Sequence, residues 1–286
     1  MSELVTVYVP TKNRLKLLKR AVYSVLAQTT REIELIVVSD GSDDGSCEFI
    51  NSIVSDISIR LIHNEKSVGA CVARNQAIEI ANGQFVTGLD DDDFFMPHRV
   101  ERFLEHWKLL ESQNIHFSCL FDSKIAYDGT KIFTESTSEA VTAKEILCAN
   151  KIGNQVFTRR DWIVEAGCYD PEMPAWQDWE LWVRLLTHFG DAKNIQQHSY
   201  FSDMSHDFDR ITMKSGEKIR KAARVFYGKH CENHDRLKLL RALGSYPQFA
   251  FTLNDLWVLF KGREFRKVAG KLARRNFLNS FDSTFV

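Results

Sequence analysis

Four consecutive aspartates at positions 90–93 are the part of this 286-residue chain most suited to chemistry. They follow an apolar run at residues 85–89 and precede Phe94-Phe95-Met96-Pro97. Adjacent like charges repel one another, so a bound cation is the natural way to stabilise them. Mg²⁺ and Mn²⁺ prefer such oxygen ligands, together with substrate phosphates. The alternative is an acidic surface loop that caps a helix opened by Pro97, because carboxylates stabilise helix N-termini.

A second polar segment, Ser-Asp-Gly-Ser-Asp-Asp-Gly at residues 39–45, follows the apolar run 33–38. A solvated turn would account for this composition. Its place directly after a buried strand favours another interpretation, in which Asp40 accepts hydrogen bonds from a ligand such as the N–H groups of a nucleobase.

The third candidate is Asp178, which lies among the tryptophans of the segment 176–182. Charged residues are seldom fully buried unless they are paired. An apolar setting raises the pKa of a carboxyl toward the range that suits a general base. Asp178 could also cap the helix that follows it, and the two roles are compatible.

Alternating strand and helix patterns must position these residues. We expect strands at 4–9, 33–38, 57–62 and 85–89, and helices at 15–28, 46–53, 70–81 and 97–110. Such alternation predicts an α/β fold with a parallel sheet, whose ligands bind beyond the carboxyl ends of the strands. The polar segments 10–14, 39–45 and 90–93 all fall there. Residues 122–200 have a mixed pattern, and the chain from 210 onward is helical and basic.

Composition excludes several classes of protein. A net charge of −1 gives no overall attraction to nucleic acid. The six cysteines are scattered without a CxxC pair, which indicates reduced thiols. The sequence has no signal peptide and no run of about 18 apolar residues. We therefore expect a cytoplasmic protein, either free or on a membrane surface that faces the cytosol.

Five motifs, taken in order, resemble the family 2 glycosyltransferases. They are Val-Pro-Thr-Lys-Asn-Arg (9–14), Ser-Asp-Gly-Ser-Asp-Asp (39–44), Ala-Arg-Asn (73–75), Leu-Asp-Asp-Asp-Asp-Phe-Phe-Met-Pro (89–97) and Gln-Asp-Trp-Glu-Leu-Trp-Val-Arg-Leu (177–185). The resemblance covers residues 4–190 and implies an inverting enzyme with the Rossmann-like GT-A fold, a mostly parallel sheet flanked by helices. We expect a catalytic, nucleotide-sugar-binding domain at 1–209 and a basic helical extension at 210–286 that contacts the acceptor or a membrane surface.

The resemblance also implies roles for single residues. Asp178 matches the catalytic base. Asp90 and Asp92 match the DxD pair that holds Mn²⁺ or Mg²⁺, with Asp92 as the direct ligand, and Asp91 lies against the donor sugar or ribose. The other positions implied in donor binding are Pro10, Thr11, Asn13, Arg14, Asp40 and Arg74.

Several of these assignments leave alternatives open. Arg74 could contact the donor or form a structural salt bridge. Lys12 replaces an aromatic residue that many relatives use to stack on the base, so the nucleotide is undetermined. His206 and Arg210 lie in a segment that closes over the diphosphate in relatives, although histidines in polar loops are commonly only solvated.

The C-terminal segment 253–275 combines basic residues with apolar residues at helical spacing. This pattern suits contact with an anionic membrane, or a helix packed on the main domain with a solvated basic face. Membrane contact would favour a lipid-linked acceptor such as GlcNAc-diphosphate-polyprenol, extended in O-antigen or capsule synthesis. We expect UDP-glucose or UDP-galactose as the donor, and a β-linkage formed by single displacement.

Other functions fit the sequence less well. A nucleotidyltransferase needs a glycine-rich phosphate loop after the first strand, and residues 10–14 contain no glycine. A phosphatase needs an aspartate nucleophile at the same place, and none is present. A non-catalytic binding or scaffold protein that keeps the pocket is the remaining alternative. The retention of both the aspartate cluster and Asp178 argues against it.

Overall fold

The computed structural model describes residues 3–135, 138–205, 216–230, 236–244, 251 and 253–261. The chain divides into two compact units. The first comprises Met1–Glu172 and Trp176–Phe208, and the second comprises Met173–Ala175 and Asp209–Val286. The functional division predicted at residues 209 and 210 stays a prediction.

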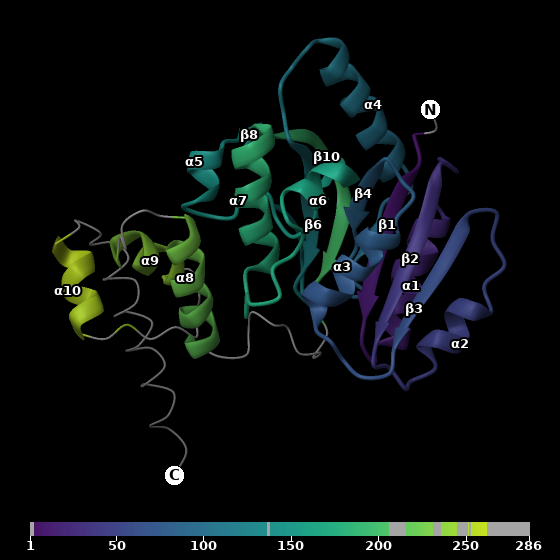
Figure 1. Cartoon of the computed structure of the whole chain (residues 1–286), viewed down its shortest axis with the longest axis horizontal. Helices are drawn as coiled ribbons and strands as arrows, with labels where there is room; N and C mark the ends of the chain where they lie inside the picture. Colours follow the sequence, from purple (N-terminus) through teal and green to yellow (C-terminus); the bar gives the residue numbers. More distant parts are fainter. Residues whose placement is uncertain are drawn as a thin grey trace. The chain divides into compact units, whose positions relative to one another are not determined.

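Parallel strands form the N-terminal half of the sheet in the first unit, in the order β3-β2-β1-β4 (Figure 1). These strands are β1 (Val5–Thr11), β2 (Ile33–Asp40), β3 (Ser58–Asn64) and β4 (Phe85–Gly88). The helices between them are α1 (Leu15–Leu26), α2 (Ser46–Asn51) and α3 (Ala70–Ile80). The α/β fold predicted from the alternating pattern is therefore confirmed, with element ends displaced by only a few residues.

The rest of the sheet is mixed. Beyond β4 the order continues β9-β6-β10-β5, with β7 paired to β6 and β8 to β10. These strands are β5 (Phe94–Phe95), β6 (Cys119–Tyr127), β7 (Ile132–Glu135), β8 (Ala140–Val141), β9 (Phe157–Arg159) and β10 (Ala192–Asp203). The helices of this half are α4 (Arg99–Ser112), α5 (Ala143–Ile146), α6 (Arg160–Glu165) and α7 (Gln177–Phe189). Helix α4 begins two residues later than predicted, with His98 as its N-cap.

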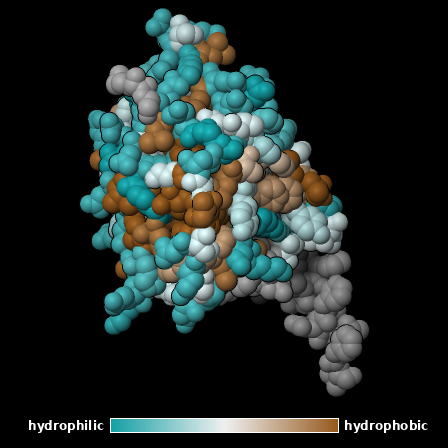
Figure 2. Space-filling view, turned by 90° about the vertical axis from the view of Figure 1, so that its right-hand side faces the viewer, coloured by the Kyte–Doolittle hydropathy of each residue, from teal (hydrophilic) through white to brown (hydrophobic). Residues whose placement is uncertain are grey.

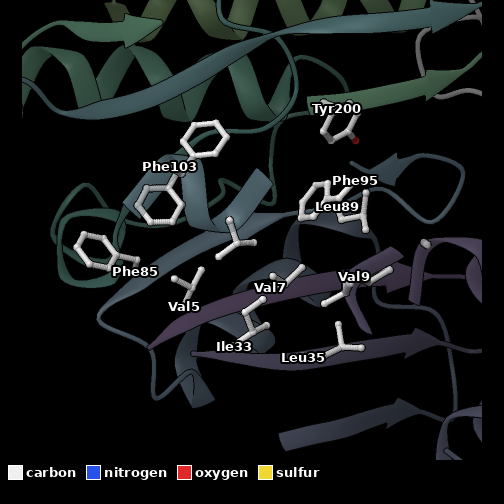
Figure 3. Close-up of a cluster of buried hydrophobic side chains, with 14 of the residues drawn as sticks. Val5, Val7, Val9, Ile33, Leu35, Phe85, Leu89, Phe95, Phe103 and Tyr200 are labelled. Carbon is white, nitrogen blue, oxygen red and sulfur yellow. The ribbon is translucent and has the colours of Figure 1, made fainter. Parts of the chain in front are cut away.

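Apolar side chains at alternate positions of β1 give the sheet one strongly apolar face (Figure 3). Val5, Val7 and Val9 pack with Leu35 and other buried residues of the sheet, α1 and α4 in one hydrophobic core. Because side chains alternate along a strand, the intervening residues of β1 point to the opposite face. Strands β1 and β2 are thus covered on both sides, and their carboxyl ends are held rigidly.

The β3 edge of the sheet is less protected. Every residue of β3 is half-buried or exposed. Figure 2 looks onto the side where β3 and α2 lie in Figure 1, and it shows apolar surface surrounded by hydrophilic side chains. The buried strands, and not this edge, therefore provide the rigid frame for polar loops.

The second unit, considered by itself, is helical where it is described. Its helices are α8 (Gly216–His230), α9 (Arg236–Leu243) and α10 (Leu253–Lys261). In α8 the side chains of Ile219, Ala222 and Phe226 are buried at helical spacing. Within the described ranges, no helix has both the length and the apolar character needed to cross a membrane. Only the first part of the predicted basic segment 253–275 lies within those ranges.

Glu34 is a buried charge that ties the sheet together. Its side chain is 1% exposed and accepts hydrogen bonds from Thr6 Oγ1 at 2.5 Å and from the backbone N–H groups of Asn82 and Gly83. Arg60 forms an ion pair with it at 2.6 Å. Burial alone would raise the pKa of this carboxyl, but the hydrogen bonds and the charge of Arg60 outweigh burial and lower it.

We expect Glu34→Ala to destabilise the fold by about 3 kcal/mol at pH 7, because it leaves buried donors without an acceptor. Urea unfolding measures this loss. Since the pKa of Glu34 is lowered in the folded state, its stabilisation is present above pH 4.5 and disappears as the pH falls through the folded-state value. The control is Asp56→Ala at an ion pair whose aspartate is 66% exposed, with an expected change below about 0.5 kcal/mol. Equal losses in both variants would contradict the assigned role of Glu34.

Candidate active site

Three polar segments meet at the carboxyl edge of the sheet. Strands β1, β2 and β4 are parallel neighbours, so their polar ends lie at one edge. Thr11 Oγ1 donates to Asp91 Oδ2 at 2.7 Å, which joins the end of β1 to the loop after β4. The N–H of Asp43 donates to Asn13 Oδ1 at 2.9 Å, which joins the ends of β1 and β2. The structure thus brings together the segments that the sequence analysis selected.

Each aspartate of the cluster has a different set of partners. Asp91 and Asp93 are buried, whereas Asp90 and Asp92 are half-buried. Arg14 Nη1 lies 3.0 Å from Asp91 Oδ1 and 3.3 Å from Asp92 Oδ2. The protein therefore supplies part of the positive charge that the aspartates require.

The cluster forms a candidate metal site. Single carboxylate oxygens of Asp90, Asp92 and Asp93 lie within 4.8 Å of one another. The sequence predicts Asp90 and Asp92 as ligands, and the structure adds Asp93 to the cluster. Burial, reinforced by the charges of Asp92 and Asp90, raises the pKa of Asp93 to about 8. Burial raises the pKa of Asp91 to about 6. Such carboxylates ionise together only when a cation compensates them, and their oxygens suit Mn²⁺ or Mg²⁺.

Strand β10 holds the cluster from another side. Tyr200 donates its hydroxyl hydrogen to Asp93 Oδ2 at 2.7 Å, and the backbone N–H of Asp203 donates to Asp93 Oδ1 at 3.0 Å. The Arg20 guanidinium bonds to the backbone oxygen of Asp92 and, at 2.5 Å, to the carboxylate of Asp203. The sequence alone does not reveal these residues, because Arg20 lies in an ordinary amphipathic helix and β10 has no clear strand pattern.

Tyr200 is positioned by a buried cation. Arg99 is 2% exposed, and its guanidinium carbon lies 5.1 Å from the centroid of the Tyr200 ring. The same group lies over the rings of Phe95 and Phe103 and 3.5 Å from the carboxylate of Asp122. Such cation–π contacts fix the tyrosine whose hydroxyl reaches the cluster.

Asp178 lies in the first turn of α7, after the N-cap Trp176 in the left-handed conformation. Burial is the main reason that the pKa of Asp178 is raised to about 6, while the backbone N–H of Trp179 and the charge of Arg74 oppose the rise. The carboxyl therefore bonds to its own helix turn and also has the pKa of a base that works near neutral pH.

Arg74 connects the cluster to the segment of Asp178. Its Nη2 lies 3.1 Å from Asp90 Oδ1, and its Nη1 donates to Gln177 Oε1 at 3.4 Å. The guanidinium carbon also lies 5.4 Å from the centroid of the Tyr169 ring. Arg74 forms the salt bridge that the sequence analysis considered, and its contact with a donor stays a prediction.

Asp40 is bound to the neighbouring loop. Its carboxylate is 5% exposed and accepts hydrogen bonds from Ser67 Oγ at 2.7 Å and from the backbone N–H groups of Val68 and Gly69 at 2.7 and 3.0 Å. Asn64 Nδ2 is a fourth donor at 3.2 Å. Asp40 thus shapes the loop 64–69, and its predicted contact with a nucleobase stays a prediction, as does that of Pro10 at the end of β1. His206 and Arg210 lie outside the described residues.

Comparison with known proteins identifies the family of this arrangement. The family model for Glycosyl transferase family 2 matches residues 6–134. A protein of Escherichia coli K12 named for colanic acid biosynthesis, the glycosyl transferase WcaA, is 33% identical over 242 residues, covering 82% of this chain and 83% of the relative. TuaG of Bacillus subtilis, named for teichuronic acid biosynthesis, is 35% identical over 130 residues, covering 45% of this chain and half of its own length.

Solved structures share the fold. Residues 1–349 of TarS from S. aureus, in complex with UDP, match with a TM-score of 0.64 at 18% identity, covering 89% of this chain and 75% of that one. The mannosyltransferase PcManGT from Pyrobaculum calidifontis, in complex with GDP-Man and Mn²⁺, matches with a TM-score of 0.58 at 16% identity, covering 94% and 74%. The GT-A fold and the family resemblance predicted from the five motifs are confirmed.

We expect Asp178→Asn to stabilise the folded protein at pH 8 by about 2 kcal/mol. The folded-state pKa of Asp178 is about 6, which lies above its ordinary value. Above pH 6 the buried carboxylate is ionised, so its desolvation destabilises the folded protein in full. At pH 4.5 the folded-state carboxyl is mostly protonated, and the gain shrinks. Urea unfolding at the two pH values measures this difference. A loss of stability at pH 8, or the same gain at both values, would contradict the raised pKa.

Proposed function

The chain belongs to glycosyl transferase family 2 and is a glycosyltransferase. On that premise we propose that it moves a hexose from UDP-glucose or UDP-galactose to a hydroxyl of a lipid-linked saccharide. The product has a β-linkage formed by single displacement. The observation that carries this proposal is the pairing of a metal-suited aspartate cluster with a carboxyl of raised pKa, connected through Arg74.

The donor end of the site is built for a diphosphate. Asp92, with Asp90 and Asp93, has the oxygen ligands for Mn²⁺ or Mg²⁺. A divalent ion held by these residues would neutralise negative charge on a leaving nucleotide. Thr11 and Arg14 hold Asp91 beside these ligands through hydrogen bonds to its two carboxylate oxygens. A nucleotide-sugar donor agrees with fold neighbours whose structures contain UDP and UDP-GlcNAc.

The acceptor end depends on Asp178. A carboxylate with a pKa near 6 is ionised at neutral pH and can still take a proton from an acceptor hydroxyl as that hydroxyl attacks the anomeric carbon. Attack from the face opposite the leaving group inverts the carbon, so an α-linked donor gives a β-linked product. Direct attack by the acceptor requires no covalent intermediate on the enzyme.

The second unit suggests what kind of acceptor binds. A cavity of about 440 Å³ on α8 is lined by Pro174, Glu217 and four basic residues, Lys218, Arg220, Lys221 and Arg224. Arg220 forms an ion pair with Asp255 at 3.7 Å. Lys218, Lys221 and Arg224 follow one another at a spacing of three residues, and like charges at that spacing destabilise a helix, so an anion is a natural occupant. We propose that this cavity receives the diphosphate of a polyprenol-linked acceptor such as GlcNAc-diphosphate-polyprenol, at the cytoplasmic surface of the inner membrane. The names of WcaA and TuaG, which refer to polysaccharide synthesis, support an acceptor of this class.

A donor panel with a GlcNAc-diphosphate-lipid acceptor tests the proposed reaction. Asp178→Asn and Asp92→Ala should each lower kcat at least about 10³-fold, because one removes the base and the other a metal ligand. EDTA should abolish turnover of the wild type. The control is Asp161→Asn, whose side chain is 90% exposed and which should retain wild-type kcat. Metal-dependent binding of a nucleotide sugar without turnover by the wild type would favour the scaffold alternative.

Charge reversal on α8 tests the acceptor site separately. Arg224→Glu should raise the KM for the diphosphate-lipid acceptor about tenfold relative to the KM for the donor, and added salt should shrink the difference. The matched control is Lys229→Glu, which makes the same charge change on the same helix outside the cavity. Equal effects of the two reversals would show that only the overall charge of the helix matters.

A further inference from the structure

One short loop contacts both ends of the proposed site. Residues 150–155, called here the 150–155 loop, connect α5 to β9. Asn154 and Gln155 at its end donate hydrogen bonds to Asp90. At its start, Asn150 Nδ2 lies 3.5 Å from Asp178 Oδ2. The loop therefore spans from the metal-suited cluster to the proposed base.

The loop is fixed in place by α7 and by its own turn. Trp182 Nε1 donates to the backbone oxygen of Gly153 at 3.1 Å. Asn150 Nδ2 donates to the same oxygen at 2.9 Å, and Asn150 Oδ1 accepts from the N–H groups of Ile152 and Gly153. Gly153 has a φ of +97°, which favours glycine, and Ile152 is 3% exposed. The side chain that follows this turn is consequently held on a rigid base.

Glycine at the end of β4 lets the loop reach Asp90. A Cβ added to Gly88 would lie 1.9 Å from Gln155 Oε1, so any larger residue would displace Gln155. In the space that Gly88 leaves, Gln155 Nε2 donates to Asp90 Oδ1 at 3.1 Å. Asn154 Nδ2 donates to the other oxygen, Asp90 Oδ2, at 2.6 Å. The two amides hold the carboxylate of Asp90 in one orientation.

The bonds of Asn154 also fix which way its own amide points. An ionised carboxylate only accepts hydrogen bonds, so the NH₂ group of Asn154 must face Asp90. The same Nδ2 lies 3.2 Å from the hydroxyl of Tyr200, which donates to Asp93. Asn154 is half-buried, and the hydrogen bonds that its side chain makes to the described residues all involve Nδ2, which leaves Oδ1 for a ligand. The side chain thus presents an oriented acceptor beside the metal-suited cluster.

We propose that Asn154 binds a hydroxyl of the donor sugar through Oδ1 and thereby takes part in selecting the sugar. This inference rests on the proposed function, which brings the nucleotide diphosphate to residues 90–93 and its hexose beside them. A sugar hydroxyl is a hydrogen-bond donor that matches a neutral amide oxygen. Hexoses differ mainly in the placing of their hydroxyls, and a fixed acceptor discriminates against a sugar that lacks the matching one.

Binding measured by calorimetry in the presence of Mn²⁺ tests this assignment. The ligands are UDP, the UDP-hexose identified in the donor panel and the monodeoxy analogues of that donor. The wild type should bind one deoxy analogue about tenfold more weakly than the parent donor. Asn154→Ala should bind the parent and that analogue equally, because the contact that separates them is gone. Asn154→Asp, which keeps an acceptor oxygen but places a second carboxylate beside Asp90, should bind UDP itself more weakly. Thermal unfolding of each variant shows whether it is folded.

The matched control is Asn150→Ala, which loosens the turn of the 150–155 loop and leaves Oδ1 of Asn154 in place. It should weaken the parent donor and every analogue by the same factor. If Asn154→Ala also weakens all ligands, UDP included, in equal proportion, Asn154 only supports Asp90 and the inference is overturned. Failure of the proposed function gives a different result, because the donor panel would then contain no UDP-hexose that the wild type turns over.

Discussion

Repulsion among four adjacent aspartates is the constraint on which the rest of this structure depends. Two unit charges 4 Å apart repel by about 1 kcal/mol in water and about 4 kcal/mol at an effective dielectric constant of 20. The protein divides this cost among separate partners. Arg14 pairs with Asp91 and Asp92, Arg74 pairs with Asp90, and the Tyr200 hydroxyl bonds to Asp93. Even with these partners, single carboxylate oxygens of Asp90, Asp92 and Asp93 lie close enough together to share one divalent ion.

This constraint explains why the supporting residues come from so many elements. A rigid parallel sheet brings the ends of β1 and β4 to one edge, so Thr11 and Arg14 can reach the loop after β4. Strand β10 adds Tyr200, whose hydroxyl bonds to Asp93. Arg74 then connects the cluster to the first turn of α7, where burial raises the pKa of the proposed base. The charges of Arg74 and Asp90 both act on Asp178, so the electrostatics of the cluster and of the proposed base are coupled.

The sequence predicted the N-terminal half of the fold because its strands are continuous apolar runs separated by amphipathic helices. It located the aspartate cluster, Asp178 and the segment 10–14 because each interrupts such a pattern with polar residues. The mixed half was not resolved, since β5 and β9 are too short to leave a pattern and the long strand β10 has irregular burial along its length. The sequence does not reveal Asn154 and Gln155 either, because uncharged amides in an irregular loop carry no periodic signal. Arg20 and Tyr200 act only through contacts between distant parts of the chain.

The most direct test of this account is a Mn²⁺ titration followed by electron paramagnetic resonance, with and without UDP. The account predicts one bound Mn²⁺ per chain, an affinity at least about tenfold higher in the presence of UDP, and loss of this site in Asp92→Asn. Mn²⁺ binding that is the same in wild type and Asp92→Asn, or that does not respond to UDP, would contradict the assignment of residues 90–93 as the metal–diphosphate site.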